Sequence, residues 1–146
     1  ADAAYAYLVA RGYRPEQIIL HGESLGTAVA VDLASRRASA GLVLEAPFTS
    51  AREVAGKVLP LIGPLLIWSY DTRSKIRRVH APMLILHGDH DEVIPFEMGR
   101  ALFEVAPTPK SFWTVTGAGH NDIVETAGTR YRERLNAFYL SLAPSQ

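Results

Sequence analysis

Apolar and polar residues are distributed along the chain in two distinct patterns. Four short segments are rich in apolar and β-branched residues, which is typical of strands buried within a sheet. These segments lie at 17–20, 42–46, 83–87 and 110–116. Elsewhere, apolar residues recur at every third or fourth position, which predicts amphipathic helices. The predicted helices span 2–11, 25–36, 96–106 and 122–142.

The alternation of strands with helices predicts the α/β class. Such chains form right-handed crossovers and a parallel sheet that helices cover on both faces. We therefore expect one domain over residues 1–146, with a three-layer α/β/α arrangement and about four strands. The residues of the second predicted helix that are expected to face the sheet are Leu25, Ala28, Val29 and Leu33.

The segment 47–80 fits neither pattern well. After Ser50 it is expected to form a short helix, and then comes an apolar run at 58–68, VLPLIGPLLIW, which prolines interrupt. This run is far shorter than the ~20 residues that a membrane-spanning helix needs. Two interpretations stay open for it: a lid or pocket wall beside a binding site, or a buried connection packed on the sheet.

Between the first predicted strand and the following helix lies the motif Gly22-Glu23-Ser24-Leu25-Gly26. This is G-x-S-x-G in the strand–turn–helix context that a nucleophilic serine requires. A sharp turn there strains the serine backbone and lifts the hydroxyl above the sheet, while Gly22 and Gly26 allow strand and helix to approach closely. Because the first N–H groups of a helix have no internal partner, the Leu25 N–H is a candidate oxyanion donor.

A serine hydroxyl needs a base near neutral pH, and the chain has five histidines. His120 is the candidate, because it follows the fourth predicted strand in the flexible, exposed loop TGAGHND. The catalytic rate is expected to rise as the imidazole of His120 loses its proton. His21 and His87 end their strands and are expected to be packing or hydrogen-bonding groups, whereas His80 and His90 are expected at the surface.

A carboxylate is needed to orient the imidazole. The segment LHGDHDEVIP follows the third predicted strand directly and offers Asp89, Asp91 and Glu92. The candidate nucleophile, base and acids all lie just past the C-terminal ends of parallel strands, where open α/β sheets place their sites. The sequence therefore predicts that three distant segments meet at one edge of the sheet.

The amino-acid composition excludes several kinds of catalytic chemistry and gives no sign of a charged partner. Lys plus Arg equals Asp plus Glu, so the formal net charge is zero and nothing indicates a nucleic-acid or acidic partner. The chain has no cysteine, which excludes disulfides, thiolate catalysis and cysteine-ligated zinc. Because the histidines do not have the spacing of metal ligands, we expect no metal and no organic cofactor. No signal peptide opens the sequence, and a cytoplasmic location is the working expectation.

These stretches together resemble the serine hydrolases of the α/β-hydrolase fold. The resemblance covers essentially the whole chain and rests on GESLGTAVA, LEAPFTS, PMLILHGDHDEVIP and GAGHND. The order serine, acid, histidine is also that of this fold. Within it, the chain is similar to esterase-like hydrolases related to prolyl oligopeptidase-type catalytic domains and to ABHD-type lipid and thioester hydrolases.

The resemblance implies roles for individual residues. In the family the acid is the aspartate of H-G-x-x-D, which here is Asp91 rather than Asp89. The resemblance likewise implies that Ser24 is the nucleophile and His120 the base. The residues that it places at a substrate pocket are Pro47, Phe48, Leu65 and Trp68.

The chain also departs from the family pattern. The family's sheet normally has more strands, and its nucleophile follows a central strand, whereas here it follows the first. We therefore expect the chain to be the C-terminal part of the fold, truncated at its N-terminus, with the second oxyanion donor on an upstream loop. Removing one such donor costs on the order of 3 kcal/mol in the barrier. The 146 residues alone are thus expected to be a weak catalyst and, with 17–20 as an exposed apolar edge, to aggregate.

The expected function is hydrolysis of a small-molecule carboxylic ester or thioester through an acyl-enzyme. Two alternatives remain. One is a serine peptidase of the prolyl oligopeptidase kind, in which the peptide would need further acidic groups or a further domain. The other is a non-catalytic module with a hydrolase-like fold, which would have no need for serine, acid and histidine together.

Overall fold

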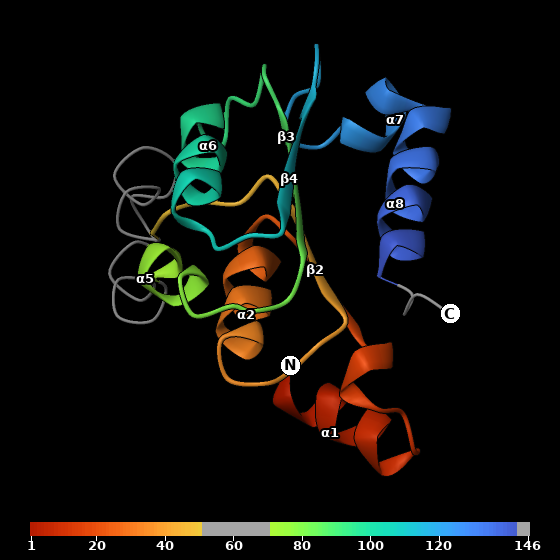
Figure 1. Ribbon diagram of the computed structural model, residues 1–146. Coiled ribbons are helices and arrows are strands. Elements are labelled where there is room, and N and C mark those ends of the chain that lie inside the picture. The colour runs from red at the N-terminus through yellow and green to blue at the C-terminus, as the bar shows by residue number, and fades with distance from the viewer. Residues whose placement is uncertain (51–70, 143–146) are drawn as a thin grey trace.

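The computed structural model describes residues 1–50 and 71–142, and their core is a parallel β-sheet (Figure 1). The strands stand in the order β1-β2-β3-β4, and neighbouring strands are parallel. They are β1 (Ile19–Glu23), β2 (Gly41–Glu45), β3 (Met83–Gly88) and β4 (Lys110–Val115). The predicted α/β class with a parallel sheet is confirmed.

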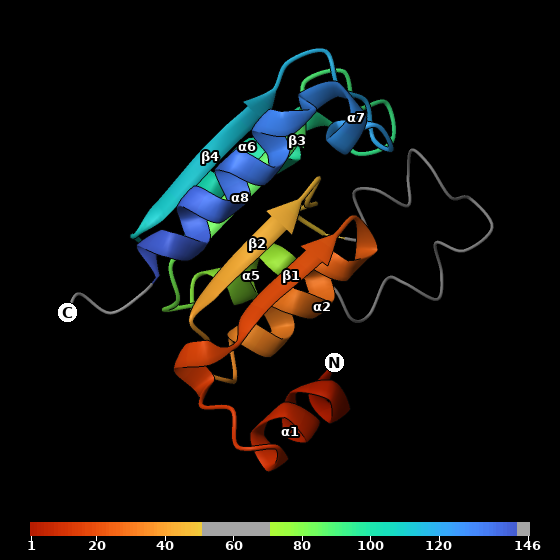
Figure 2. The same ribbon diagram turned by 90° about the vertical axis from the view of Figure 1, so that its right-hand side faces the viewer.

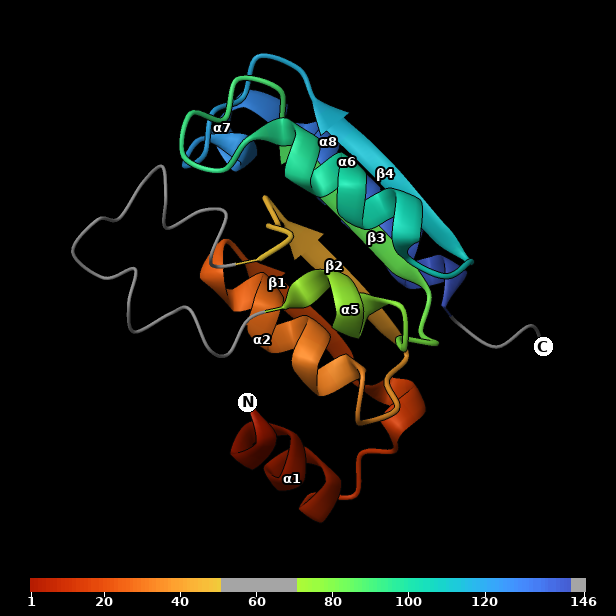
Figure 3. The same cartoon turned by 90° about the vertical axis from the view of Figure 1, so that its left-hand side faces the viewer.

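Helices cover both faces of this sheet. The described helices are α1 (Asp2–Ala10), α2 (Leu25–Ala34), α5 (Thr72–Ile76), α6 (Phe96–Val105), α7 (Ile123–Ala127) and α8 (Thr129–Ser141). Figure 2 shows α7 and α8 on one face, and Figure 3 shows α2, α5 and α6 on the other. The expected three layers are therefore present, and α1 lies beyond the N-terminal end of β1 (Figure 2). Among the described helices, none has the length and apolarity to cross a bilayer.

The two inner strands explain the two-sided core. Successive side chains of a strand point to opposite faces. Leu42 and Leu44 of β2 therefore join the core under α2, α5 and α6, whereas Val43 joins the core under α7 and α8. Every residue of β2 and β3 is buried, as their nearly continuous apolar sequence predicts.

The first strand differs from its prediction in position and burial. Instead of 17–20, it runs from Ile19 to Glu23, because Pro15–Gln17 form a single 3₁₀ turn before it. Its pairing with β2 continues as far as Glu23 opposite Glu45, so the strand extends into the serine motif. Among the described residues β1 is an edge strand, and accordingly Ile19 and Leu20 are only half-buried.

Two helix predictions were wrong in detail. The predicted helix 122–142 is two helices, because Gly128 takes a left-handed backbone with φ 57° between α7 and α8. In α2 the side chain of Leu25, expected to face the sheet, is 48% exposed, since it lies in the first turn at the rim. The predicted helix after Ser50 lies outside the described residues, as does most of the predicted lid.

Candidate active site

Ser24 occupies a tight turn between β1 and α2. Its backbone has φ 50° and ψ −119°, a conformation that L-residues with a side chain seldom adopt. The turn is held from both sides. The Ser24 N–H donates to the carbonyl of Glu45 over 2.9 Å, and the N–H and hydroxyl of Thr27 donate to the Ser24 carbonyl over 3.0 and 2.6 Å. The strain expected from the motif is therefore present.

The two glycines of the motif have different roles. A Cβ on Gly22 would lie 2.4 Å from the carbonyl oxygen of Gly26 and 2.8 Å from the Cα of Thr27, so the strand meets the helix here only because Gly22 has no side chain. A Cβ on Gly26 would meet no described atom within 4 Å. The expectation that Gly26 permits close approach was therefore wrong for the described structure, and Glu23 between them is exposed.

The structure brings Ser24, Asp91 and His120 together. The Nε2 atom of His120 lies 2.9 Å from Oγ of Ser24, and its Nδ1 lies 2.8 Å from Oδ2 of Asp91. The side chain of His120 is 11% exposed and that of Asp91 is fully buried. The three residues come from the ends of β1, β3 and β4, so the predicted meeting of three strand ends is what the geometry shows.

The loop that carries His120 is fixed rather than loose. The Gly119 N–H donates to Oδ1 of Asp122 over 2.6 Å, and the Gly117 N–H donates to Oδ1 of Asp89 over 2.6 Å. A Cβ on Gly88 would lie 2.2 Å from the carbonyl oxygen of Ala118, which shows how closely this loop packs on the end of β3. The predicted flexible, exposed loop is thus tied to the segment that bears the acid.

The structure also separates the candidate carboxylates. Oδ1 of Asp91 accepts backbone N–H bonds from Val93 and Ile94 over 2.9 and 2.8 Å, which leaves Oδ2 for His120. Asp89 instead receives the Gly117 N–H, and Glu92 is exposed. Only Asp91 among these three therefore contacts the candidate base.

His87 is a buried neighbour of Asp91 whose contact the sequence prediction missed. Its Nε2 lies 3.0 Å from the carbonyl oxygen of Ile94 and 3.3 Å from Oδ2 of Asp91. Both neighbours are hydrogen-bond acceptors. Its Nδ1 has no partner among the described residues, and a Cβ on Gly99 would lie 2.4 Å from it. The expected hydrogen-bonding role of His87 is present, but its neighbour Asp91 becomes apparent only from the packing of the loop after β3.

Glu45, a buried residue of β2, also stabilises the turn at Ser24. Glu45 of β2 supplies the carbonyl that holds Ser24, and its side-chain Oε1 accepts from Nε2 of His21 over 2.5 Å and from the hydroxyl of Tyr131. Burial and the hydrogen bond to Glu45 together raise the pKa of Tyr131 well above its usual range. His21 thus has the expected hydrogen-bonding role, whereas the contact between Tyr131 and Glu45 was not predicted.

The environment favours opposite charges on Asp91 and His120. Burial opposes ionisation of Asp91, yet hydrogen bonds from His120, His87 and the Ile94 N–H outweigh it and hold the pKa of this carboxyl well below its usual range. The hydrogen bond to Asp91 raises the pKa of His120, against the opposing effect of burial. The site can therefore hold a carboxylate beside an imidazole that readily accepts a proton.

The remaining predicted site residues are placed as follows. Pro47 is buried, and Phe48 is buried in a cluster with Ala28 and Ile94. Leu65 and Trp68 lie outside the described residues. Across the described ranges 1–50 and 71–142, no group of three or more histidine and acidic side chains is arranged to hold a metal ion.

Comparison with known proteins places this geometry in a known fold. No protein-family model matches the chain. It is 44% identical over 139 residues to alpha/beta hydrolase domain-containing protein 17B of Xenopus laevis, an alignment that covers 94% of this chain and 46% of the relative. The chain thus spans about half the length of the curated relatives it matches.

Solved structures agree at the level of the fold. The esterase domain of a Rhodothermus marinus protein superposes with a TM-score of 0.75 at 22% identity, over 94% of this chain and 65% of that one. A puromycin-hydrolyzing peptidase of Mycobacterium tuberculosis gives a TM-score of 0.81 at 18% identity, over 99% of this chain and 25% of that one. The described residues have the α/β-hydrolase fold, and the predicted resemblance is confirmed to that extent.

Proposed function

We propose that the chain carries the catalytic residues of a serine hydrolase that cleaves carboxylic esters or thioesters through an acyl-enzyme. The observation that carries this proposal is the continuous line of contacts from Oγ of Ser24 through the imidazole of His120 to Asp91, at 2.9 and 2.8 Å. Both distances are those of hydrogen bonds. An arrangement of nucleophile, base and orienting acid is what acyl transfer to a serine requires.

In this mechanism the hydroxyl of Ser24 attacks the carbonyl carbon of the substrate. His120 accepts the hydroxyl proton at Nε2 and then donates it to the leaving alcohol or thiol. Water, activated by the same imidazole, attacks the acyl-enzyme and releases the acid. Asp91 accepts the Nδ1–H of His120 throughout, which fixes the tautomer and stabilises the imidazolium.

The oxyanion of the tetrahedral intermediate needs N–H donors. We assign one to the Leu25 backbone, because Leu25 is the first residue of α2 and follows the nucleophile directly. Pro47 and Phe48, at the start of the 47–80 segment, are proposed to contribute to the acyl pocket.

The proposed substrate is a small acyl ester or thioester, and no cofactor takes part. The names of the relatives state a fold rather than a reaction, and the solved neighbours include both esterases and peptidases. Identity to these structures is low enough that it supports the fold alone. The ester assignment therefore needs a direct comparison of substrates.

Hydrolysis of a chromogenic short-chain ester by the full-length protein tests the proposal. The unmodified protein should show a burst of released alcohol stoichiometric with enzyme, since a reactive ester acylates Ser24 faster than water hydrolyses the acyl-enzyme. Ser24→Ala should lower kcat by on the order of 10⁶-fold. Equal rates for parent and Ser24→Ala would show that the fold serves binding rather than this chemistry.

A matched pair of substrates separates ester cleavage from peptide cleavage. The same acyl group is offered as an ester and as an aminoacyl amide, and kcat/KM is compared. The proposal expects clear preference for the ester. A kcat/KM for the amide as high as that for the ester would instead favour the peptidase.

A further inference from the structure

We propose that a basic pocket at the end of the sheet opposite Ser24 binds a phosphate-bearing anion. This pocket has a volume of about 720 Å³ and lies between the loop after α2 and the loop after α5. Its basic lining residues are Arg36, Arg37, Arg77, Arg78 and His80. The proposal is independent of the hydrolase function.

The topology places the pocket far from the candidate active site. Residues 34–39 precede β2 and residues 77–82 precede β3, so the pocket lies at the N-terminal ends of these strands. Ser24, Asp91 and His120 lie past the C-terminal ends of parallel strands. Figure 3 shows the two loops side by side at the lower end of the sheet, away from the turn before α2.

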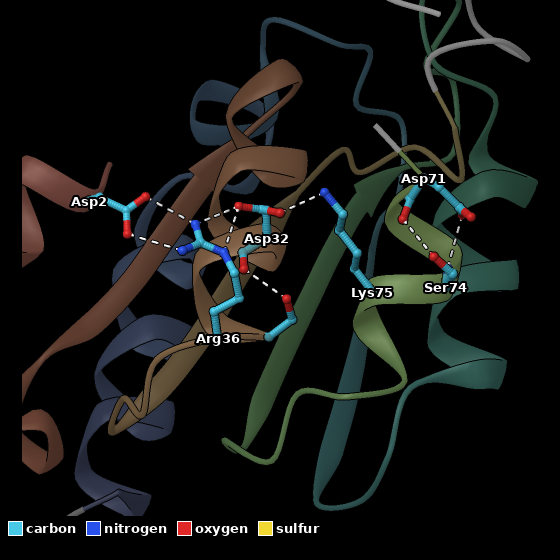
Figure 4. Close-up of polar contacts among 7 residues, drawn as sticks. Asp2, Asp32, Arg36, Asp71, Ser74 and Lys75 are labelled. Carbon is cyan, nitrogen blue, oxygen red and sulfur yellow. Dashed lines mark hydrogen bonds and ion pairs between the residues drawn. The ribbon is translucent and has the colours of Figure 1, made fainter. Parts of the chain in front are cut away.

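Nearby carboxylates already have cationic partners. As Figure 4 shows, Arg36 contacts Asp2 over 3.0 Å and Asp32 over 2.7 Å, and Lys75 contacts Asp32 over 2.6 Å. The hydrogen bonds with Asp2 and Asp32 raise the pKa of Arg36, so it stays fully protonated. This network uses both carboxylates to fix Arg36 and Lys75.

The positive charges of Arg77 and Arg78 are not offset in this way. Arg77 and Arg78 are exposed and have no carboxylate within ion-pair distance in the described part of the chain. Arg37 is only 4.0 Å from Asp2, at the limit of an ion pair. No acidic residue is among the described residues that line the pocket. The cavity therefore presents an excess of positive charge.

The donors also suit phosphate in geometry. A guanidinium offers parallel N–H groups that bind two phosphate oxygens at once, and more than one of them can engage a single anion. Ser39 belongs to the same lining, and its hydroxyl is buried without a hydrogen-bond partner among the described residues. The volume is within the usual range for small-ligand pockets.

Isothermal titration calorimetry of the full-length protein with pyrophosphate tests the site. Pyrophosphate should bind saturably and more weakly as salt is raised, because the contacts are charged and partly exposed. The double variant Arg77→Gln/Arg78→Gln should bind roughly tenfold more weakly or worse, since charged hydrogen bonds are lost. Both side chains are exposed, so the variant should keep the parental melting temperature.

A matched control has the same change in net charge elsewhere. Arg14→Gln/Arg132→Gln neutralises two exposed arginines outside the pocket and should bind pyrophosphate as the parent does. Ester hydrolysis should be unchanged in both double variants, because neither touches the Ser24 site. Equal binding by the parent and the Arg77/Arg78 variant, or equal loss in the control, would overturn the proposal.

Vesicles distinguish the two sources of phosphate. If the ligand is a lipid headgroup, the protein should float with phosphatidylcholine vesicles that contain a phosphoinositide, and pyrophosphate should displace it. If the ligand is a soluble phosphate, pyrophosphate should bind to the protein. The protein should then stay in solution with pure phosphatidylcholine vesicles and with vesicles that contain the phosphoinositide. Binding to neither pyrophosphate nor phosphoinositide vesicles contradicts the site.

Discussion

Ser24, His120 and Asp91 each depend on neighbours that hold them in place. Ser24 keeps a strained backbone because Glu45 and Thr27 bind its N–H and carbonyl. Asp91 is fixed by two backbone N–H groups on one oxygen, so the other oxygen is free to orient the imidazole. At the scale of single residues, the proposed chemistry rests on this positioning.

The pH dependence of the rate follows from the contact between Asp91 and His120. The base must be neutral to accept the Ser24 proton, so kcat/KM should rise as His120 deprotonates. The hydrogen bond to Asp91 raises the pKa of His120, which moves the midpoint of this rise above about 6.5, the unperturbed value. A pH profile of ester hydrolysis by the full-length protein measures it. A rate that is flat between about pH 5 and 8 would argue against His120 as the base.

Replacing the acid should alter both rate and profile. Asp91→Asn is expected to lower kcat by roughly 10⁴-fold, because the amide favours the wrong imidazole tautomer. In this variant the rise of kcat/KM with pH should have its midpoint at a lower pH than in the unmodified protein. The reason is that the carboxylate that raises the pKa of His120 is gone. Asp89→Asn is the matched control: it contacts Gly117 but not His120, and should keep the parental midpoint.

Among the elements, the junction of β1 and α2 shows how far sequence could predict the site. The motif predicted a strained serine because a tight turn between a strand and a helix allows few backbone conformations at that residue. It could not distinguish Gly22 from Gly26, because which glycine faces the other element depends on the angle at which α2 leaves the turn. The break at Gly128 was missed because apolar residues keep a helical spacing across it, although the glycine that ends α7 is visible in the sequence.

The two glycines give a matched test of this junction. Gly22→Ala should destabilise the fold by roughly 1–3 kcal/mol, because the new methyl group meets the backbone of Gly26. Gly26→Ala should be neutral or slightly stabilising, since alanine is the better helix former and its methyl meets no described atom. Urea unfolding of the full-length variants measures both. Equal losses at the two positions would contradict the close contact between Gly22 and α2.

On the scale of the whole molecule, the site is a product of topology. Residues 24, 91 and 120 are far apart in sequence, yet parallel strands bring their C-terminal ends to one edge of the sheet. This is why their meeting could be predicted without coordinates. The buried contacts of His87 and Tyr131 could not, because they depend on side-chain packing between neighbouring elements rather than on strand order.

The exposed strand β1 leads to a prediction for the 146 residues measured by themselves. Among the described residues β1 pairs only with β2, so its outer N–H and C=O groups are open to another strand. The isolated chain should therefore self-associate with rising concentration and hydrolyse esters weakly. Sedimentation and rate measurements test this. A monomer that melts cooperatively and matches the full-length rate would refute it.

Covalent labelling of the full-length protein with a fluorophosphonate probe tests the proposed roles of Ser24, Asp91 and His120 most directly. Such a probe phosphonylates an activated serine, and peptide mass spectrometry identifies the residue. One adduct is expected, on Ser24, and its formation should be lost in Ser24→Ala and strongly slowed in Asp91→Asn. Absence of any adduct, or an adduct that persists in Ser24→Ala, would contradict these roles.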